Sequence, residues 1–325
     1  MNQLLTIEDL NVEFRERGEV TNRPLRGVSL EIRQGEILGV VGETGCGKSL
    51  TGLATLGLLP SGAKPSGRIV IDGQEQKLGR PSPLRGSAIS IVFQNPGTAF
   101  NPLFTLGAQM DDVLRRHREL DRKERRERVL RYLEQVGLPD PERVYGSYAH
   151  ELSGGMLQRA MIAMALVCEP RLLILDEPTT ALDVTVAKQI LDLVLSLRDR
   201  FGFGVMLITH NLGVVREICD RVAVLYAGRV IETGDTAEVL SNPAHPYTRG
   251  LMNALPARHR HGERLEAIAG QVPARLVDVV GCAFAERCPI AVERCFSVDP
   301  APIPVHGDAA HRAACIRVNE GRVEA

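Results

Sequence analysis

Residues 42–49 read GETGCGKS, which matches the GxxxxGK(S/T) pattern of a phosphate-binding P-loop. A short apolar run rich in strand-forming residues, 36–41, comes directly before it, and a helix-compatible run, 50–54, follows. The glycines let successive backbone N–H groups approach phosphate oxygens, and the positive end of the following helix dipole faces the same anion. Strand, loop and helix in this order are the context that the motif requires, and together they predict a nucleotide site.

Two side chains of this loop have predicted chemical roles. Lys48 pairs with the β- and γ-phosphates, and Ser49 coordinates Mg²⁺. The alternative is a glycine-rich turn that binds nothing, but such a turn has no use for Lys-Ser at the start of a helix. The predicted nucleotide contacts of the segment are Gly42, Glu43, Thr44, Gly45, Cys46, Gly47, Lys48, Ser49 and Leu50.

Length and charge limit the classes of protein to consider. The chain has 325 residues, which predicts one nucleotide-binding unit and an appendix. Its 39 Lys and Arg are balanced by 40 Asp and Glu, so nothing in the net charge of −1 indicates a nucleic-acid partner. No apolar run approaches the roughly 18 to 20 residues of a membrane helix. The first residues lack the basic region of a secretory signal, so we expect the chain to stay in the cytosol.

Two strands, at 4–14 and 28–32, are predicted before the P-loop, and the first ends at Phe14. Phe14 either stacks on adenine or fills a core position at the strand end. A further strand, 89–93, is followed by Gln94, at the carboxyl edge where α/β folds place their ligand contacts. Gln94 could therefore reach Mg²⁺ or the attacking water, and a plain polar strand end is the alternative.

Two fully apolar strands predict a parallel sheet that is covered on both faces. The strand in 171–178, RLLILDEP, ends in Asp176 and Glu177. We expect Asp176 to hold Mg²⁺ through water and Glu177 to polarise the attacking water, with purely structural carboxylates as the alternative. The strand in 204–210 ends in His210, for which we favour a γ-phosphate contact over a structural role.

A second helix start also suits an anion. Residues 152–159 read LSGGMLQR, in which Ser153 can cap the helix while Gly154 and Gly155 leave backbone N–H groups uncovered at its positive end. One nucleotide can contact both helix starts only if they face each other. Between the two sites, residues 110–137 are helical and rich in arginine, but acids at helical spacing favour ion pairs on a solvated face over a nucleic-acid stripe.

Taken in order, these motifs resemble those of the ATP-binding subunit of ABC transporters over residues 1 to about 235. The set comprises GETGCGKS, Gln94, LSGGM, LILDEP, Ala181-Leu182-Asp183 and His210. The resemblance implies an α/β fold: a P-loop NTPase (RecA-like) core with an antiparallel β subdomain and a helical subdomain at about 95–165. It also implies ATP hydrolysis in a head-to-tail dimer, in which the LSGGM segment of one chain closes over ATP held by the other.

Roles for individual residues follow from the same resemblance. Glu177, His210 and Gln94 are expected to be catalytic. Ser49, Gln94 and Asp176 are expected at Mg²⁺. The other expected nucleotide contacts are Phe14, Ser153, Gly154, Gly155, Asp176 and Asp183.

The last ninety or so residues, 236–325, have a different composition and contain four of the seven cysteines: Cys282, Cys288, Cys295 and Cys315. In a reducing compartment such clustering favours a shared ligand over disulfides or incidental thiols. Four thiolates suit tetrahedral zinc or an iron–sulfur cluster, and the spacing fits neither a zinc ribbon nor a ferredoxin.

This extension, with the stretch NPAHPYTR at 242–249, resembles that of the oligopeptide, dipeptide and nickel uptake branch of ABC importers. The resemblance implies a [4Fe–4S] cluster on the four cysteines, with zinc as the lesser alternative. It implies two permease chains, a second ATP-binding subunit (a distinct chain or a second copy), an extracytoplasmic binding protein and a peripheral place on the cytoplasmic face of the cell membrane. The rival function is an ABC-type ATPase acting on nucleic acid or ribosomes.

Overall fold

The computed structural model describes residues 3–180, 182–255, 268–273 and 276–318. The chain divides into two compact units. The first, here called the helical unit, consists of Met1–Leu5, Ile32–Glu36 and Pro81–Ile208. The second, here called the P-loop unit, consists of Thr6–Glu31, Ile37–Arg80 and Thr209–Ala325.

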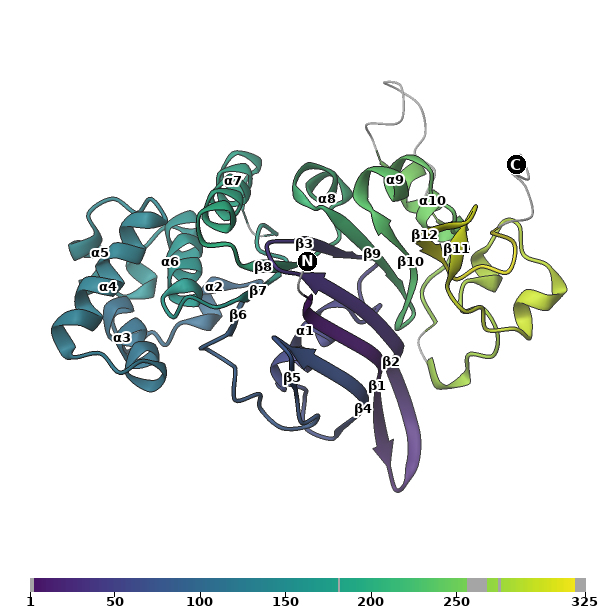
Figure 1. Cartoon of the computed structure of the whole chain (residues 1–325), viewed down its shortest axis with the longest axis horizontal. Coiled ribbons are helices and arrows are strands. Elements are labelled where there is room, and N and C mark those ends of the chain that lie inside the picture. Colours follow the sequence, from purple (N-terminus) through teal and green to yellow (C-terminus); the bar gives the residue numbers. More distant parts are fainter. Residues whose placement is uncertain (1–2, 181, 256–267, 274–275, 319–325) are drawn as a thin grey trace. The chain divides into compact units, whose positions relative to one another are not determined.

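The P-loop unit contains an antiparallel sheet with the strand order β2-β1-β4-β5 (Figure 1). Its strands are β1 (Gln3–Glu16), β2 (Glu19–Arg33), β4 (Ala63–Ile71) and β5 (Gln74–Glu75). Arg17 and Gly18 make a tight turn between β1 and β2, both with positive φ, as a two-residue hairpin requires. This hairpin makes β2 much longer than the strand predicted at 28–32. An Asp72-Gly73 turn follows β4, and both of its residues have positive φ.

The second sheet of this unit has the order β11-β12-β10-β9-β3. Its strands are β3 (Ile37–Val41), β9 (Arg221–Tyr226), β10 (Arg229–Asp235), β11 (Ile303–Val305) and β12 (Asp308–Ala313). The buried strand β3, which leads into the P-loop, runs parallel to β9. β9 and β10 form an antiparallel hairpin at the end of the core, and β12 of the extension then pairs with β10. The C-terminal extension therefore continues the sheet of the core.

Short helices surround this sheet. They are α1 (Lys48–Leu56), α8 (Leu212–Ile218), α9 (Thr236–Ser241) and α10 (Pro246–Asn253), with the 3-10 turns η3 (Leu276–Asp278), η4 (Ala285–Arg287) and η5 (Glu293–Phe296) in the extension.

The helical unit contains the three parallel strands β6 (Ile89–Val92), β7 (Leu172–Asp176) and β8 (Gly204–Thr209). The first four residues of β7 are fully buried, which confirms the fully apolar strand predicted at this place. Its helices are α2 (Pro96–Ala99), α3 (Leu106–His117), α4 (Arg122–Gln135), α5 (Pro141–Gly146), α6 (Gly154–Leu166) and α7 (Val184–Phe201), with the 3-10 turn η1 (Ala149–Glu151). Helices α3 to α6 pack side by side (Figure 1).

The helical stretch predicted at 110–137 is two helices, α3 and α4. The chain is not helical between them, and α4 starts with a capping box. The Asp121 side chain accepts a hydrogen bond from the Glu124 N–H at 2.8 Å, and the Glu124 side chain accepts one from the Asp121 N–H at 2.7 Å. This reciprocal cap satisfies the first donors of a new helix, so α4 begins here and α3 does not continue.

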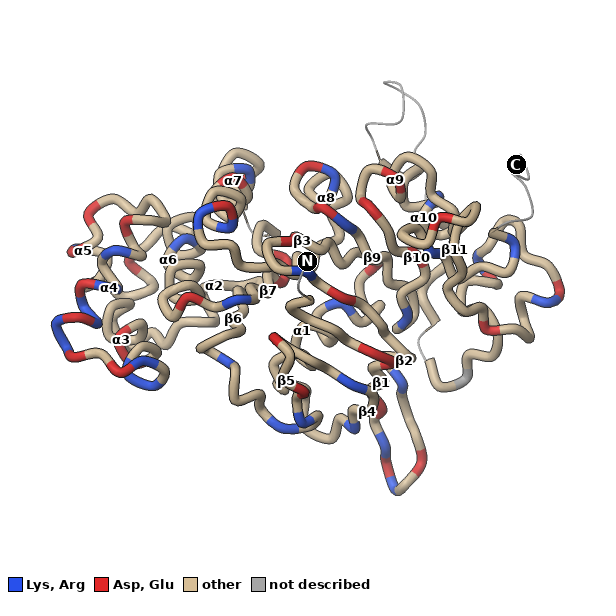
Figure 2. Tube along the Cα trace, viewed as in Figure 1, with Lys and Arg blue, Asp and Glu red and all other residues tan. Residues whose placement is uncertain are grey.

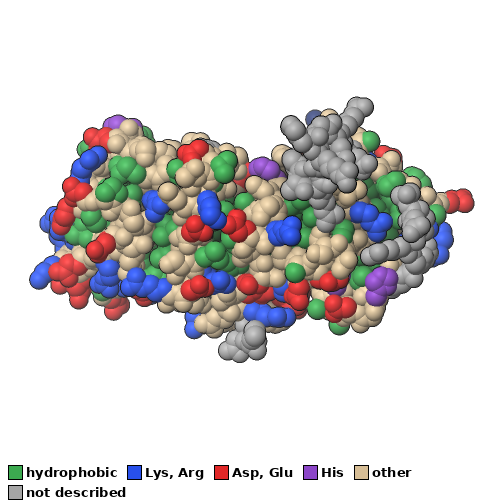
Figure 3. Space-filling model, turned by 90° about the horizontal axis from the view of Figure 1, so that it is seen from above, with side chains coloured by type: hydrophobic (Ala, Val, Ile, Leu, Met, Phe, Trp, Pro, Cys, Tyr) green, Lys and Arg blue, Asp and Glu red, His purple; other side chains and the backbone are tan. Residues whose placement is uncertain are grey.

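Charges of both signs alternate along α3, α4 and α5 (Figure 2). Arg125 pairs with Asp111 at 2.7 Å, and Arg126 pairs with Glu142. The face visible in Figure 3 likewise carries acidic and basic side chains interspersed. Both of these pairs join different helices, and the Arg125–Asp111 pair is largely buried. The pairs at helical spacing on a solvated face that the sequence analysis expects are Arg115–Asp112 and Lys123–Glu127. None of the helices in the described ranges is both long and apolar enough to cross a membrane.

One buried carboxylate fastens the extension to the sheet. Glu232 of β10 accepts from the backbone N–H groups of Ala244 and His245 at 2.7 and 3.0 Å. Its Oε1 atom also lies 2.7 Å from Nε2 of His311 in β12. Three groups from two later segments thus depend on one side chain that solvent does not reach.

We expect Glu232→Gln to lower the free energy of unfolding by about 2 to 4 kcal/mol, because the amide replaces an acceptor by a donor that faces buried donors. Chemical denaturation measures this loss. The matched control is Glu238→Gln, an exposed position in α9, where the change should stay within about 0.5 kcal/mol. Equal stability of the two variants would contradict the anchoring role of Glu232.

Candidate nucleotide-binding site

The P-loop lies so close to neighbouring backbone that two of its glycines cannot be replaced. Gly42 has a φ of 151°, and a Cβ atom there would lie 2.2 Å from the carbonyl oxygen of Leu225. Gly47 has a φ of 107°, and a Cβ atom would lie 2.6 Å from a methyl group of Leu25. The sequence pattern therefore has a steric cause in this chain: only glycine fits where the loop crosses the end of β9 and the strand β2.

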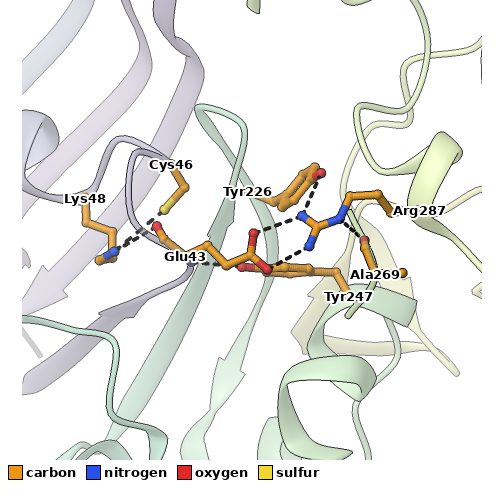
Figure 4. Close-up of polar contacts among 7 residues, drawn as sticks. All are labelled: Glu43, Cys46, Lys48, Tyr226, Tyr247, Ala269 and Arg287. Atoms are coloured by element: carbon orange, nitrogen blue, oxygen red, sulfur yellow. Dashed lines mark hydrogen bonds and ion pairs between the residues drawn. The ribbon is translucent and has the colours of Figure 1, made fainter. Parts of the chain in front are cut away.

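Lys48 is the first residue of α1, and its side chain lies along the loop (Figure 4). Its Nζ atom donates to the carbonyl oxygens of Gly42 and Glu43 at 2.8 and 3.0 Å. Both acceptors are neutral, so a phosphate oxygen would be the stronger partner for the ammonium group. Gly47 precedes the helix without a side-chain cap, which leaves the first backbone N–H groups of α1 to a ligand.

The other loop residues divide by exposure. Thr44, Gly45 and Ser49 are exposed, as ligand contacts must be. Cys46 is completely buried, and burial raises the pKa of its thiol above the ordinary value. Cys46 can therefore meet a nucleotide through its backbone and not through sulfur. Leu50, in the first turn of α1, is half-buried.

In the helical unit the predicted catalytic carboxylate is held by two donors. Glu177 Oε2 accepts from Gln94 Nε2 at 3.2 Å and from Thr180 Oγ1 at 2.8 Å. Its backbone N–H donates to the carbonyl oxygen of Ile208 at 2.9 Å. Glu177 has a φ of 48°, a costly conformation for a residue with a Cβ atom that is typical of functional sites. Sequence reasoning placed Gln94 and Glu177 in one site but missed Thr180, whose spacing of three residues from Glu177 was the available signal.

Asp176 is the last residue of β7 and pairs in register with Ile208 of β8. It is half-buried at the carboxyl edge of the strand, next to Glu177. A carboxylate at this place can hold a divalent cation through water.

Two helix starts in the helical unit carry the remaining predicted contacts. The Ser153 side chain caps α6 by accepting from the Met156 N–H at 3.4 Å. Asp183 caps α7 by accepting from the Val186 N–H at 2.9 Å, so its carboxylate has a structural role that the sequence analysis did not assign. A Cβ atom at Gly155 would lie 2.9 Å from a methyl group of Val186, which shows how closely the two helices approach. Gly154 is exposed, and Ala181 lies outside the described residues.

Phe14 and His210 lie in the P-loop unit. Phe14 is half-buried in β1, and its carbonyl oxygen accepts from Thr21 Oγ1 at 3.2 Å. His210 is exposed directly after β8, and the next residue, Asn211, caps α8 by accepting from two backbone N–H groups. The P-loop and His210 are thus parts of one unit, whereas Gln94, Asp176 and Glu177 are parts of the other.

The structure adds contacts to the P-loop that the sequence analysis did not find. The Glu43 N–H donates to the hydroxyl oxygen of Tyr247 at 2.9 Å, and the Glu43 carboxylate forms a two-pronged ion pair with Arg287 at 2.9 and 3.0 Å (Figure 4). Tyr247 belongs to the NPAHPYTR stretch, so that motif was the only sequence signal. Arg287 directly precedes Cys288 and had no signal at all.

The four cysteines of the extension line a single cavity. Burial, together with the three other thiols, raises the pKa of Cys282 to about 11. Within the described ranges, no three His, Cys, Asp or Glu side chains are close enough together to hold a metal ion. The described residues therefore show no metal site for the expected [4Fe–4S] cluster or for zinc, although the four predicted ligands line one cavity. The other cysteines, Cys46, Cys168 and Cys219, are buried elsewhere.

Two family models match the chain. The ABC transporter model matches residues 25–180, and the model of the oligopeptide/dipeptide transporter C-terminal region matches residues 231–295. A probable peptide ABC transporter ATP-binding protein of Sinorhizobium fredii is 46% identical over 323 residues, which is 98% of this chain and 96% of the relative. The dipeptide transport ATP-binding protein DppD of Bacillus subtilis is 44% identical over 307 residues, covering 92% and 91% of the two chains.

Solved structures agree with these sequence matches. CbiO1 of Clostridium perfringens, part of an ABC transporter complex, is 31% identical with a TM-score of 0.63, covering 74% of this chain and 92% of its own. A dimeric ATP-binding cassette with bound ADP and phosphate is 28% identical with a TM-score of 0.62, covering 72% and 99%. The P-loop geometry, the ordered motifs and relatives aligned over nearly the whole length lead to one conclusion: the chain belongs to the ATP-binding proteins of ABC transporters, in the group that carries the oligopeptide/dipeptide transporter C-terminal region.

Proposed function

We propose that this protein binds and hydrolyses ATP to energise an ABC importer for peptides. The observation that carries the proposal is the presence, in one chain, of a sterically defined P-loop and of the C-terminal region found in oligopeptide and dipeptide transporters. The relatives that support peptides as the cargo are named for peptide or dipeptide transport. A related small solute such as nickel is the alternative cargo.

In the proposed reaction, Lys48 transfers its hydrogen bonds from the carbonyl oxygens of the loop to the β- and γ-phosphates. Ser49 and Gln94 would hold Mg²⁺, with Asp176 acting through water, and the ion would supply charge neutralisation for the phosphates. Glu177, fixed by Thr180 and Gln94, orients and polarises the attacking water. His210 contacts the γ-phosphate.

Closure over ATP requires a second ATP-binding subunit, either a distinct chain or a second copy. The start of α6, with Ser153, Gly154 and Gly155, would cover the γ-phosphate of the partner's nucleotide, with Asp183 near the same junction. The exposure of Ser153 and Gly154 supports this, because a helix start that binds an anion must be accessible. To act as a switch, the γ-phosphate must favour the closed dimer by a few kcal/mol. Phe14 would stack on the adenine ring.

The membrane partners would be two permease chains, served by an extracytoplasmic binding protein, with this subunit on the cytoplasmic face. Three large apolar residues near Gln94 support a docking surface: Phe93, Leu103 and Phe104 are all exposed, Leu103 to 78%. Exposing large apolar side chains to water is unfavourable, and a partner that covers them removes this cost. In the proposed domain division, residues 1–235 form the ATPase, with helices at about 95–165, and residues 236–325 form the extension.

The four-cysteine cavity is the proposed site of a [4Fe–4S] cluster held by Cys282, Cys288, Cys295 and Cys315. Four thiols around one cavity fit a group that fills its centre, because the ligands of a cluster stand farther apart than those of a single ion. The cluster would supply a covalent cross-link between segments that have little secondary structure.

We expect Glu177→Gln to lower the rate of ATP hydrolysis by about 10² to 10⁴, because the amide cannot polarise water. Nucleotide binding should persist and trap the closed dimer. Phosphate release and size-exclusion chromatography with ATP measure the two effects. Glu134→Gln, an exposed position in α4, is the matched control and should hydrolyse ATP normally. Undiminished turnover by the Glu177 variant would remove that residue from catalysis.

Lys48→Ala should weaken ATP binding itself, by about tenfold or more, because the charge-assisted hydrogen bonds to the phosphates are lost. Titration with a fluorescent ATP analogue measures the dissociation constant. Lys64→Ala, an exposed lysine of β4, should leave it unchanged. Normal affinity in the Lys48 variant would show that this side chain does not contact nucleotide.

Anaerobically purified protein should contain iron and acid-labile sulfide in equal amounts, about four of each per chain. Cys288→Ser should lose both, whereas Cys168→Ser, at a buried thiol far from the cavity in sequence, should retain them. Elemental analysis of the three proteins measures this. Stoichiometric zinc without sulfide would refute the cluster, and full iron in the Cys288 variant would refute the ligand set.

A further inference from the structure

The four-cysteine extension reaches the P-loop through one arginine. Arg287 ends the turn η4, and Cys288 of the cavity follows it. Its Nη1 and Nη2 atoms donate to the two carboxylate oxygens of Glu43 at 2.9 and 3.0 Å (Figure 4). The guanidinium also donates to Tyr226 Oη at 3.2 Å and to the carbonyl oxygen of Ala269 at 2.8 Å. Four of its five N–H groups can thus be assigned to a partner.

Packing fixes this arginine as well. The guanidinium carbon lies 5.6 Å from the ring centroid of Tyr226 and 5.8 Å from that of Phe284. The Arg287 side chain is only 7% exposed, and the hydrogen bonds to Glu43 raise the pKa of Arg287 above its ordinary value. A bidentate, largely buried ion pair of this kind is ordered, unlike an exposed pair between flexible side chains.

A second contact from the extension fixes the backbone of the same loop residue. Tyr247 is completely buried, with its ring 4.7 Å from that of Tyr226 and edge-on to that of Phe284. Its hydroxyl oxygen accepts from the Glu43 N–H. The Tyr247 N–H in turn donates to Nδ1 of His245, and burial lowers the pKa of that histidine to about 4, which keeps Nδ1 an acceptor.

Glu43 links these contacts to the phosphate site. It is the second residue of the P-loop, and its carbonyl oxygen holds the Nζ atom of Lys48 at 3.0 Å. A carboxylate in this loop repels a triphosphate unless a cation compensates it. Arg287 is that cation, and it is supplied by a segment 244 residues away along the chain.

We propose that Arg287 and Tyr247 are positioning residues of the nucleotide site, through which the four-cysteine extension sets the affinity of the P-loop for ATP. The inference rests on the proposed function, that the P-loop binds ATP. Arg287 neutralises and orients the Glu43 carboxylate, and Tyr247 fixes the Glu43 backbone. Neither residue needs to touch the nucleotide. Because Cys288 follows Arg287 directly, a change in the geometry of the cavity moves the arginine and, through Glu43, the loop.

The test compares Arg287→Ala with Arg294→Ala in the full-length protein. Both arginines lie in a 3-10 turn directly before a cavity cysteine, but Arg294 is exposed. Fluorescent ATP binding should weaken about tenfold in the Arg287 variant and stay unchanged in the Arg294 variant. The KM for ATP should rise by a similar factor, while kcat at saturating ATP changes less than about twofold. Tyr247→Phe, which keeps the ring, should weaken binding a few-fold.

A double variant separates charge from packing. Glu43→Gln removes the charge that Arg287 compensates, so the pair Glu43→Gln, Arg287→Ala should recover most of the lost affinity. Normal ATP affinity in folded Arg287→Ala overturns the inference, and so does a double variant as weak as the single one. If Arg287→Ala folds poorly by thermal unfolding, Arg287→Lys and Arg287→Gln replace it. Affinity should then fall from wild type to Lys to Gln, and equal affinities overturn the inference. A wild-type protein that does not bind ATP would instead refute the proposed function.

Discussion

The path of the loop at 42–49 in the P-loop unit is fixed by a steric constraint. The loop lies against other backbone, and there is no space for a side chain at Gly42. A Cβ atom there would lie 2.2 Å from the carbonyl oxygen of Leu225, next to Tyr226 at the end of β9. The loop takes its shape from β3, which leads into it, and from β9, which lies beneath it. The position of Lys48 follows from the course of this loop, because α1 starts where the loop ends.

The extension completes the same sheet and the same site. It supplies β12 to the edge at β10 and three of the donors around Glu232. It also supplies Tyr247 and Arg287, which reach Glu43 in the P-loop. A segment without a structural role in the ATPase would need neither the buried carboxylate of Glu232 nor the ion pair between Arg287 and Glu43 of the P-loop. Its removal would leave both Glu232, which is buried, and Glu43, which is partly exposed, without these partners.

The sequence predicts those features whose cause is local. The P-loop, the buried strand β7 and the Asp72-Gly73 turn each depend on neighbouring residues, and each could be predicted. The break between α3 and α4 also had a local signal, Asp121 followed by Glu124, which the helical periodicity on both sides concealed. Periodicity reports which face of a helix is buried, but it does not report where one helix ends and the next begins.

Features that depend on distant residues could not be predicted. Nothing near Glu43 indicates a partner 244 residues away, since an arginine at the end of a short 3-10 turn has no periodicity and no motif. The cap role of Asp183 shows the converse, because a residue expected at the nucleotide is also required to start α7.

The same reasoning applies to the four cysteines. Their number predicts a shared ligand, but only the fold shows that they surround one cavity and that Arg287, beside them, ends at the P-loop. The proposed coupling between the cavity and the phosphate site therefore has a geometric basis, in the contacts of Arg287 and Tyr247 with Glu43.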